Sequence, residues 1–192
     1  MVFVDVVVVA LVAGLLLGGR LGTLAETPLR GMGLAFGAIA LQVVAFPFDV
    51  LPWQTPGSVA RALWLVSYAL LIGMLIQNVH LRGTLLVAAG LGSNLLAILA
   101  NGGLMPVRGS ALVAAHRHYA VHNNSIQLVR PHLGALVDRW AVPHWIPFGN
   151  VYSVGDVLIG LGIALAIVTA MRATEVPAAP VVGRVELTPQ PE

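Results

Sequence analysis

The sequence predicts an all-α fold, an integral membrane bundle of about five transmembrane helices, and two observations carry this prediction. Hydrophobic residues make up 58% of the 192 residues and charged residues only 9%, and the mean hydropathy is +0.89. A soluble domain carries about 25% charged residues, so this chain has too few to cover a soluble surface. Several apolar runs also reach the length that crosses a hydrocarbon core of roughly 30 Å.

Five apolar runs are long enough to be predicted as spans. They cover about residues 3–18, 31–46, 59–76, 84–100 and 153–171. The first run contains Asp5 and lacks a positively charged start, so it predicts a retained span and not a cleaved signal peptide. The chain therefore divides into a transmembrane domain over 1–172, which includes an extracytoplasmic segment over 102–150, and a disordered cytoplasmic tail over 173–192.

Small and polar residues predict how these spans pack. Ala10, Gly14 and Gly18 recur every four residues in the first span, so a neighbouring helix can approach that face closely. Gln42 in the second span would cost several kcal/mol if it were unpaired in lipid, so we expect a hydrogen bond to another helix. The fourth span carries Asn94 on a face of small residues, which should point into the bundle.

The extracytoplasmic segment is the longest stretch without a span. It opens with NGGLMPV, whose glycines and proline predict a tight turn. Residues Ser110 to His122 predict a short amphipathic helix, and later prolines exclude a longer one. Trp140 and Trp145 are typical of a segment that lies along the membrane interface.

Arginines in short loops predict the orientation. With five spans, Arg20, Arg30, Arg82 and Arg172 fall on one side, which the positive-inside rule makes cytoplasmic. We therefore expect the N-terminus outside, the C-terminus in the cytoplasm and the segment 102–150 outside.

Two carboxylates are the candidate catalytic residues. Asp138 lies in LGALVDRW and Asp156 opens the last span, so the predicted topology puts both at one membrane face. Two carboxyl groups that approach closely share a proton and can act as acid and base on a water molecule. The structural alternatives are a Ser153–Asp156 capping box and an exposed Asp138–Arg139 pair, and both stay open.

A polar cluster is expected around Asp156. Asn94 and Asn101 are two helical turns apart and point the same way, while Asn150 and Ser153 precede the last span. We expect these four residues to converge with Asp156 at the outer end of the bundle. Asp156, Gly160 and Ala164 share one face of the last span, which predicts close approach of the fourth span there.

Metal and cofactor sites receive little support. His118 and His122 have a spacing that can place two ligands on one helix face, but no third ligand is specified, so no metal site is predicted. The chain has no Cys, which excludes disulfides and Cys-ligated metals. Its arginines are scattered, which argues against nucleic acid as a partner. We expect no cofactor; the expected partners are the lipid bilayer and other membrane proteins or a second copy.

Two stretches resemble known families. NLLAILANGGLMPV (94–107) and PFGNVYSVGDVLIGLG (147–162) are similar to the two hallmark motifs of a family of bacterial multi-pass membrane proteins of unknown function. A weaker resemblance is to lipoprotein signal peptidase, a membrane aspartyl protease. GALVDR (134–139) and NVYSVGD (150–156) resemble its two aspartate motifs in order and separation, and Asn101 and Gly103 resemble its Asn-x-Gly turn.

The peptidase resemblance has departures. Ala135 replaces the asparagine that precedes the first aspartate, extra residues separate Asn150 from Asp156, and five spans replace four. Two functions follow as hypotheses. The first is a structural or accessory component of a membrane assembly. The alternative, implied by the peptidase resemblance, is an intramembrane aspartyl hydrolase that uses Asp138 and Asp156.

Overall fold

The computed structural model describes residues 2–47, 53–115, 121–122, 124–142 and 151–173. Within these residues the helices are α1 (Val2–Leu16), α2 (Leu21–Ala25), α3 (Met32–Ala45), α4 (Gly57–Gln77), α5 (Thr84–Ala100), α6 (Gly109–Ala114) and α7 (Val154–Met171). The strands are β1 (Met105–Val107), β2 (Val121–His122), β3 (Ser125–Gln127), β4 (Trp140–Ala141) and β5 (Val151–Tyr152). The fold is mostly helical, as predicted. The expected disordered tail, apart from Ala173, lies outside the described residues.

Each predicted span corresponds to one apolar helix. Two of them, α4 and α7, are long and apolar enough to cross a membrane, whereas α1, α3 and α5 are shorter apolar helices. A short helix, α2, occupies part of the stretch between Arg20 and Arg30, which connects the first two predicted spans.

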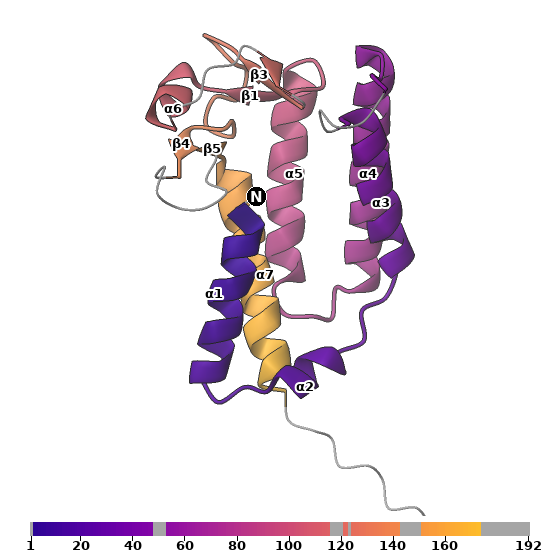
Figure 1. Ribbon diagram of the computed structural model, residues 1–192, viewed down its shortest axis with the longest axis vertical. Helices are drawn as coiled ribbons and strands as arrows, with labels where there is room; N and C mark the ends of the chain where they lie inside the picture. Colours follow the sequence, from indigo (N-terminus) through magenta and orange to yellow (C-terminus); the bar gives the residue numbers. More distant parts are fainter. Residues whose placement is uncertain (1, 48–52, 116–120, 123, 143–150, 174–192) are drawn as a thin grey trace, which may run out of the picture.

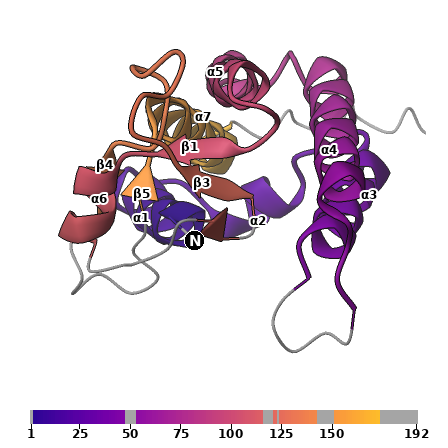
Figure 2. The same cartoon turned by 90° about the horizontal axis from the view of Figure 1, so that it is seen from above.

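The helices form two packed groups. α3 packs along α4, and α7 packs along both α5 and α1, whereas α4 and α5 touch over a much smaller area. Figure 2 shows α3 and α4 standing together to one side of α1, α5 and α7. The expected hydrogen bond of Gln42 joins α3 to α4, because its amide nitrogen lies 3.0 Å from the Ser67 hydroxyl.

Glycines set the contact between α1 and α7. A Cβ atom on Gly14 would overlap the side chain of Met171 on α7, with the Met171 Cε only 2.9 Å away. Ala10 is 2% exposed on the same helix. Gly18, expected to continue this stripe, instead follows the helix with a φ of +80° and open space around it, because α1 ends at Leu16.

Two small sheets close one end of the bundle, in the segment that was expected to lie along the membrane interface. β1 pairs with β3 in parallel, β2 pairs with β3 antiparallel, and β4 pairs with β5 antiparallel. An isolated parallel bridge links Val107 of β1 to Asp138, which lies two residues before β4. We call α6, β1–β5 and the described residues that connect them the cap, which lies over the ends of α5 and α7 at the top of Figure 1.

The predicted helix from Ser110 to His122 is wrong at its end, while residues 116–120 lie outside the described residues. α6 ends at Ala114, and Val121 and His122 form a strand paired with Ile126 and Ser125. The backbone N–H and C=O groups of Val121 and His122 bond to β3 instead of to a helix. The spacing of apolar residues along the chain does not reveal a partner strand.

Candidate functional site

Backbone pairing fixes Asp138 between two strands of the cap. Its amide donates to the carbonyl oxygen of Pro106 at 3.0 Å, and its carbonyl oxygen accepts from the amide of Arg108 at 2.9 Å. The next residue, Arg139, donates its amide to the carbonyl oxygen of Tyr152 at 3.1 Å. The NGGLMPV turn and the strand that leads into α7 therefore hold Asp138 from opposite sides.

Asp156 is held by the start of its own helix and by α5. Its side chain accepts from the backbone amide of Ser153 at 2.9 Å, and its own amide donates to the Ser153 hydroxyl at 3.1 Å, which completes the capping box. Its other oxygen accepts from the Asn94 side-chain amide at 2.9 Å. The Ser153 hydroxyl lies 2.8 Å from the Asn94 side-chain oxygen and 3.0 Å from the Asp156 carboxylate.

Two glycines bring α5 and α7 close enough for these bonds. A Cβ atom on Gly155 would overlap the Asn94 side chain and lie 2.6 Å from the carbonyl oxygen of Gly90. A Cβ atom on Gly162 would lie 2.7 Å from the carbonyl oxygen of Gly83. The predicted pairing of the fourth and fifth spans is therefore observed, but Gly160, expected on this face, meets Val6 of α1.

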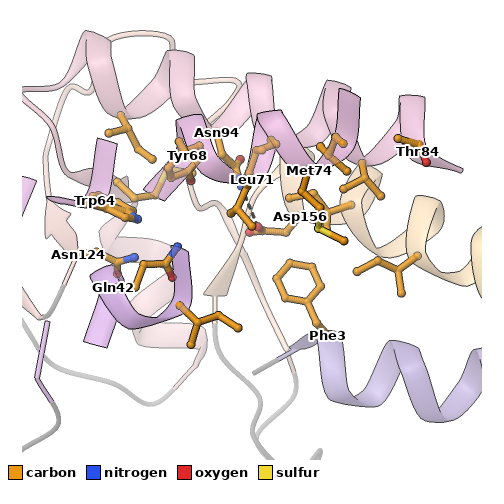
Figure 3. A pocket seen from close by; sticks show the side chains of 18 of the residues that line it. Phe3, Gln42, Trp64, Tyr68, Leu71, Met74, Thr84, Asn94, Asn124 and Asp156 are labelled. Atoms are coloured by element: carbon orange, nitrogen blue, oxygen red, sulfur yellow. Dashed lines mark hydrogen bonds between the residues drawn. The ribbon is translucent and has the colours of Figure 1, made fainter. Parts of the chain in front are cut away.

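Both aspartates line one cavity of about 820 Å³ between the two helix groups. The cap end of the cavity is polar, because Asn94, Asp138, Asp156 and the cap residues Asn124 and Ser125 line it. Its remaining wall is mostly apolar. Figure 3 shows Asn94 and Asp156 joined by a hydrogen bond, with Trp64, Leu71 and Met74 along the cavity.

The two carboxyl groups differ in their surroundings. Asp138 is 8% exposed, and no hydrogen bond among the described residues reaches its carboxyl group. Burial and, second, the negative charge of Asp156 raise the pKa of Asp138 from 3.8 to about 8. Asp138 therefore holds a proton at neutral pH, while Asp156 is an acceptor of several hydrogen bonds.

The structure brings together three of the five residues expected to form the polar cluster: Asn94, Ser153 and Asp156. Asn101 is bonded elsewhere. Its side-chain oxygen accepts from the His132 amide at 2.8 Å, and its side-chain nitrogen donates to the His132 carbonyl oxygen at 2.9 Å. It thus ties the end of α5 to the stretch that leads to Asp138. Asn150 lies outside the described residues.

The histidine pair is not on one helix face. His122 belongs to β2, and His118 lies outside the described residues. In the part of the chain that the structure describes, no three His, Cys, Asp or Glu side chains come together in a way that could hold a metal ion.

One residue of the site was missed by sequence reasoning. Tyr68 of α4 lines the cavity together with both aspartates. Tyr68 lies in an apolar helix. From the sequence alone, a tyrosine that lines a polar cavity cannot be distinguished there from a tyrosine packed in a hydrophobic core.

Fold and site together define a helical, largely apolar bundle, closed at one end by two small sheets, with two carboxyl groups on one cavity. The chain belongs to DUF5317, a family of unknown function, whose model matches residues 26–168. The expected membership of a family of unknown function is thereby confirmed, and the matched range contains both aspartates and Asn94. No curated protein and no solved structure matches the chain.

Proposed function

We propose that the chain is a five-span membrane protein with its N-terminus outside, its C-terminus in the cytoplasm and the cap on the outer side. Large apolar side chains exposed on all five long helices support this, because lipid can cover them. Examples are Val9 of α1, Phe36 of α3, Ile76 of α4, Leu85 of α5 and Leu161 of α7. The distribution of arginines in short loops supports the orientation.

Reporter fusions test this topology. A reporter fused at Glu192 should give a cytoplasmic signal, and a reporter inserted within α6 should give an extracytoplasmic one. A cytoplasmic signal from the α6 insertion would overturn the orientation.

We further propose that Asp138 and Asp156 are the catalytic pair of an intramembrane hydrolase that cleaves an amide bond. One observation carries this proposal: a buried carboxyl group with a raised pKa and a second, hydrogen-bonded carboxyl group line the same cavity. Such a pair supplies a general acid and a general base for one water molecule. The resemblance to the aspartate motifs of lipoprotein signal peptidase points the same way.

These two carboxyl groups can carry out every proton transfer that hydrolysis of an amide bond requires. Asp156 takes a proton from water while the water oxygen bonds to the substrate carbonyl carbon, and Asp138 gives its proton to the carbonyl oxygen. The resulting diol collapses when Asp156 gives its proton to the amide nitrogen and the C–N bond breaks. The diol returns a proton to Asp138, so both groups regain their starting states.

The Asp156 carboxylate has an acceptor position available for the water molecule. Each carboxylate oxygen can accept two hydrogen bonds, which gives four positions. Asn94 and the Ser153 amide occupy one each, and the Ser153 hydroxyl can occupy a third. One position is left for the water proton. The apolar wall of the cavity favours a substrate whose cleaved bond adjoins an apolar segment.

The accessory-component role remains the second candidate, and a specific observation favours it. Both oxygens of Asp156 bond to Asn94 or Ser153, so the carboxylate already has a structural role that joins α5 to α7. On this alternative, Asp156→Asn keeps the fold and removes no activity.

An experiment on membranes separates the two. The wild type, Asp138→Asn, Asp156→Asn and the control Glu26→Gln are expressed, and new protein N-termini in the membrane fraction are labelled and identified by mass spectrometry. We expect a set of N-termini that appears with the wild type and the control and falls by at least about 10³-fold in both aspartate variants. Identical sets from all four proteins, at equal folded yields, would contradict the hydrolase.

A further inference from the structure

Tyr68 approaches the aspartates from the opposite wall of the cavity. It belongs to α4, whereas Asp156 belongs to α7 and Asp138 to the cap. Its side chain is 8% exposed. Figure 3 shows Tyr68 at the same end of the cavity as Asn94 and Asp156. The cavity between the two helix groups is therefore lined by a phenol from α4 and by two carboxyl groups, one from α7 and one from the cap.

The tyrosine ring is held in place by its neighbours. It packs edge-on against Trp64 with ring centroids 5.9 Å apart, and Trp64 packs edge-on against Phe46 at 5.4 Å. The adjacent Ser67 is fully buried and bonded to Gln42 of α3. A ring fixed in this way loses little conformational freedom when its hydroxyl makes a new hydrogen bond.

The hydroxyl group itself is uncommitted. None of the hydrogen bonds within the described residues uses the Tyr68 hydroxyl, although the negative charge of Asp156 acts on it. Tyr68 lines the cavity, and its hydroxyl oxygen keeps some accessible surface. A phenol is a hydrogen-bond donor at neutral pH, which an ionised carboxylate is not.

We propose that Tyr68 is a catalytic residue whose hydroxyl donates a hydrogen bond to the substrate carbonyl oxygen as that oxygen gains negative charge. This inference rests on the proposed hydrolase. Tyr68 keeps its proton throughout, while Asp138 supplies the proton that the oxygen finally binds. A fixed donor aimed at a developing oxyanion stabilises the transition state more than the ground state.

Two matched peptides test the inference without knowledge of the natural substrate. Both carry an apolar segment; one has a single secondary hydroxyl in place of the cleaved carbonyl group, and the other has a hydrated difluoroketone with two hydroxyls. The single hydroxyl occupies the water position between the carboxyl groups. The second hydroxyl of the hydrate occupies the carbonyl-oxygen position, where Tyr68 donates.

Dissociation constants are measured for the full chain in detergent and for three variants. The wild type should bind the hydrate about tenfold more tightly than the single hydroxyl. Tyr68→Phe should lose this preference and keep its affinity for the single hydroxyl. Tyr152→Phe, which removes the same atom from a ring packed on Trp140, should keep the preference. Asp138→Asn should weaken both peptides.

The outcomes separate the two proposals. If Tyr68→Phe keeps the tenfold preference, or weakens both peptides equally, the catalytic role of Tyr68 is wrong while the aspartate pair stands. If the folded wild type binds neither peptide, the hydrolase is wrong and this inference fails with it.

Discussion

Gly155→Ala should push α7 away from α5. The added Cβ atom would overlap the Asn94 side chain and lie 2.6 Å from the carbonyl oxygen of Gly90. Carbon and oxygen atoms in close contact lie about 3.3 Å apart, so the helices must part by about 0.7 Å. Neither obstacle is the far end of a flexible side chain, because Gly90 contributes backbone and Asn94 is fixed by its bonds to Asp156 and Ser153.

The expected loss of stability follows from two contributions. Overpacking of a close contact costs about 1–3 kcal/mol. Loss of the hydrogen bond from Asn94 to the Asp156 carboxylate costs about 1.5–3 kcal/mol. We therefore expect Gly155→Ala to lower the free energy of unfolding by about 4 kcal/mol.

Gly92→Ala is the matched control. Gly92 lies on α5, the helix that faces Gly155, but a Cβ atom on Gly92 meets nothing within 4 Å. It should gain up to about 1 kcal/mol from helix propensity. Unfolding is followed by circular dichroism as a denaturing detergent is titrated into mixed micelles. Equal stability of the two variants would refute the close α5–α7 contact and the site built on it.

Three further predictions follow from the structure. Folded Asp138 holds a proton up to about pH 8, whereas the unfolded chain releases it near 3.8. Wild-type stability should therefore fall by about 1.4 kcal/mol per pH unit across that window, and Asp138→Asn should flatten this dependence in unfolding titrations at several pH values. Gly14→Leu should lower the folded yield in detergent more than Val9→Leu, since Gly14 has no room for a side chain and Val9 is 67% exposed; equal yields would count against the packed stripe. Asn101→Ala should cost about 2 kcal/mol and increase amide hydrogen exchange at His132, its backbone partner; unchanged exchange would contradict that tie.

The helices and one helix pairing were predictable because their signals are local. Apolar runs of span length mark each long helix, and the small, polar face around Asn94 predicted that the fourth span meets the fifth. The face of α7 was less predictable. α7 packs between two helices, so it carries small residues on more than one side, and periodicity does not say that Gly155 meets α5 while Gly160 meets α1.

The cap and Tyr68 escaped prediction for a different physical reason. The strands of the cap are two or three residues long, which is too short to show an alternation of apolar and polar residues. The Val107–Asp138 bridge also joins residues far apart in sequence. Such pairing depends on loop closure, which no local pattern reports. Tyr68 acquires its place at the site only because α4 stands across the cavity from α7.

The protonation state of Asp138 tests the central claim most directly. Infrared spectra of the wild type, Asp138→Asn and Asp156→Asn are recorded across a pH titration, and the carbonyl stretch of protonated carboxylic acids is followed. We expect a band that persists at neutral pH in the wild type, disappears with a midpoint of about pH 8, and is missing in Asp138→Asn. In Asp156→Asn the midpoint should fall, because one of the two causes of the raised pKa is removed. A wild-type spectrum at neutral pH that matches that of Asp138→Asn would contradict a proton held on Asp138.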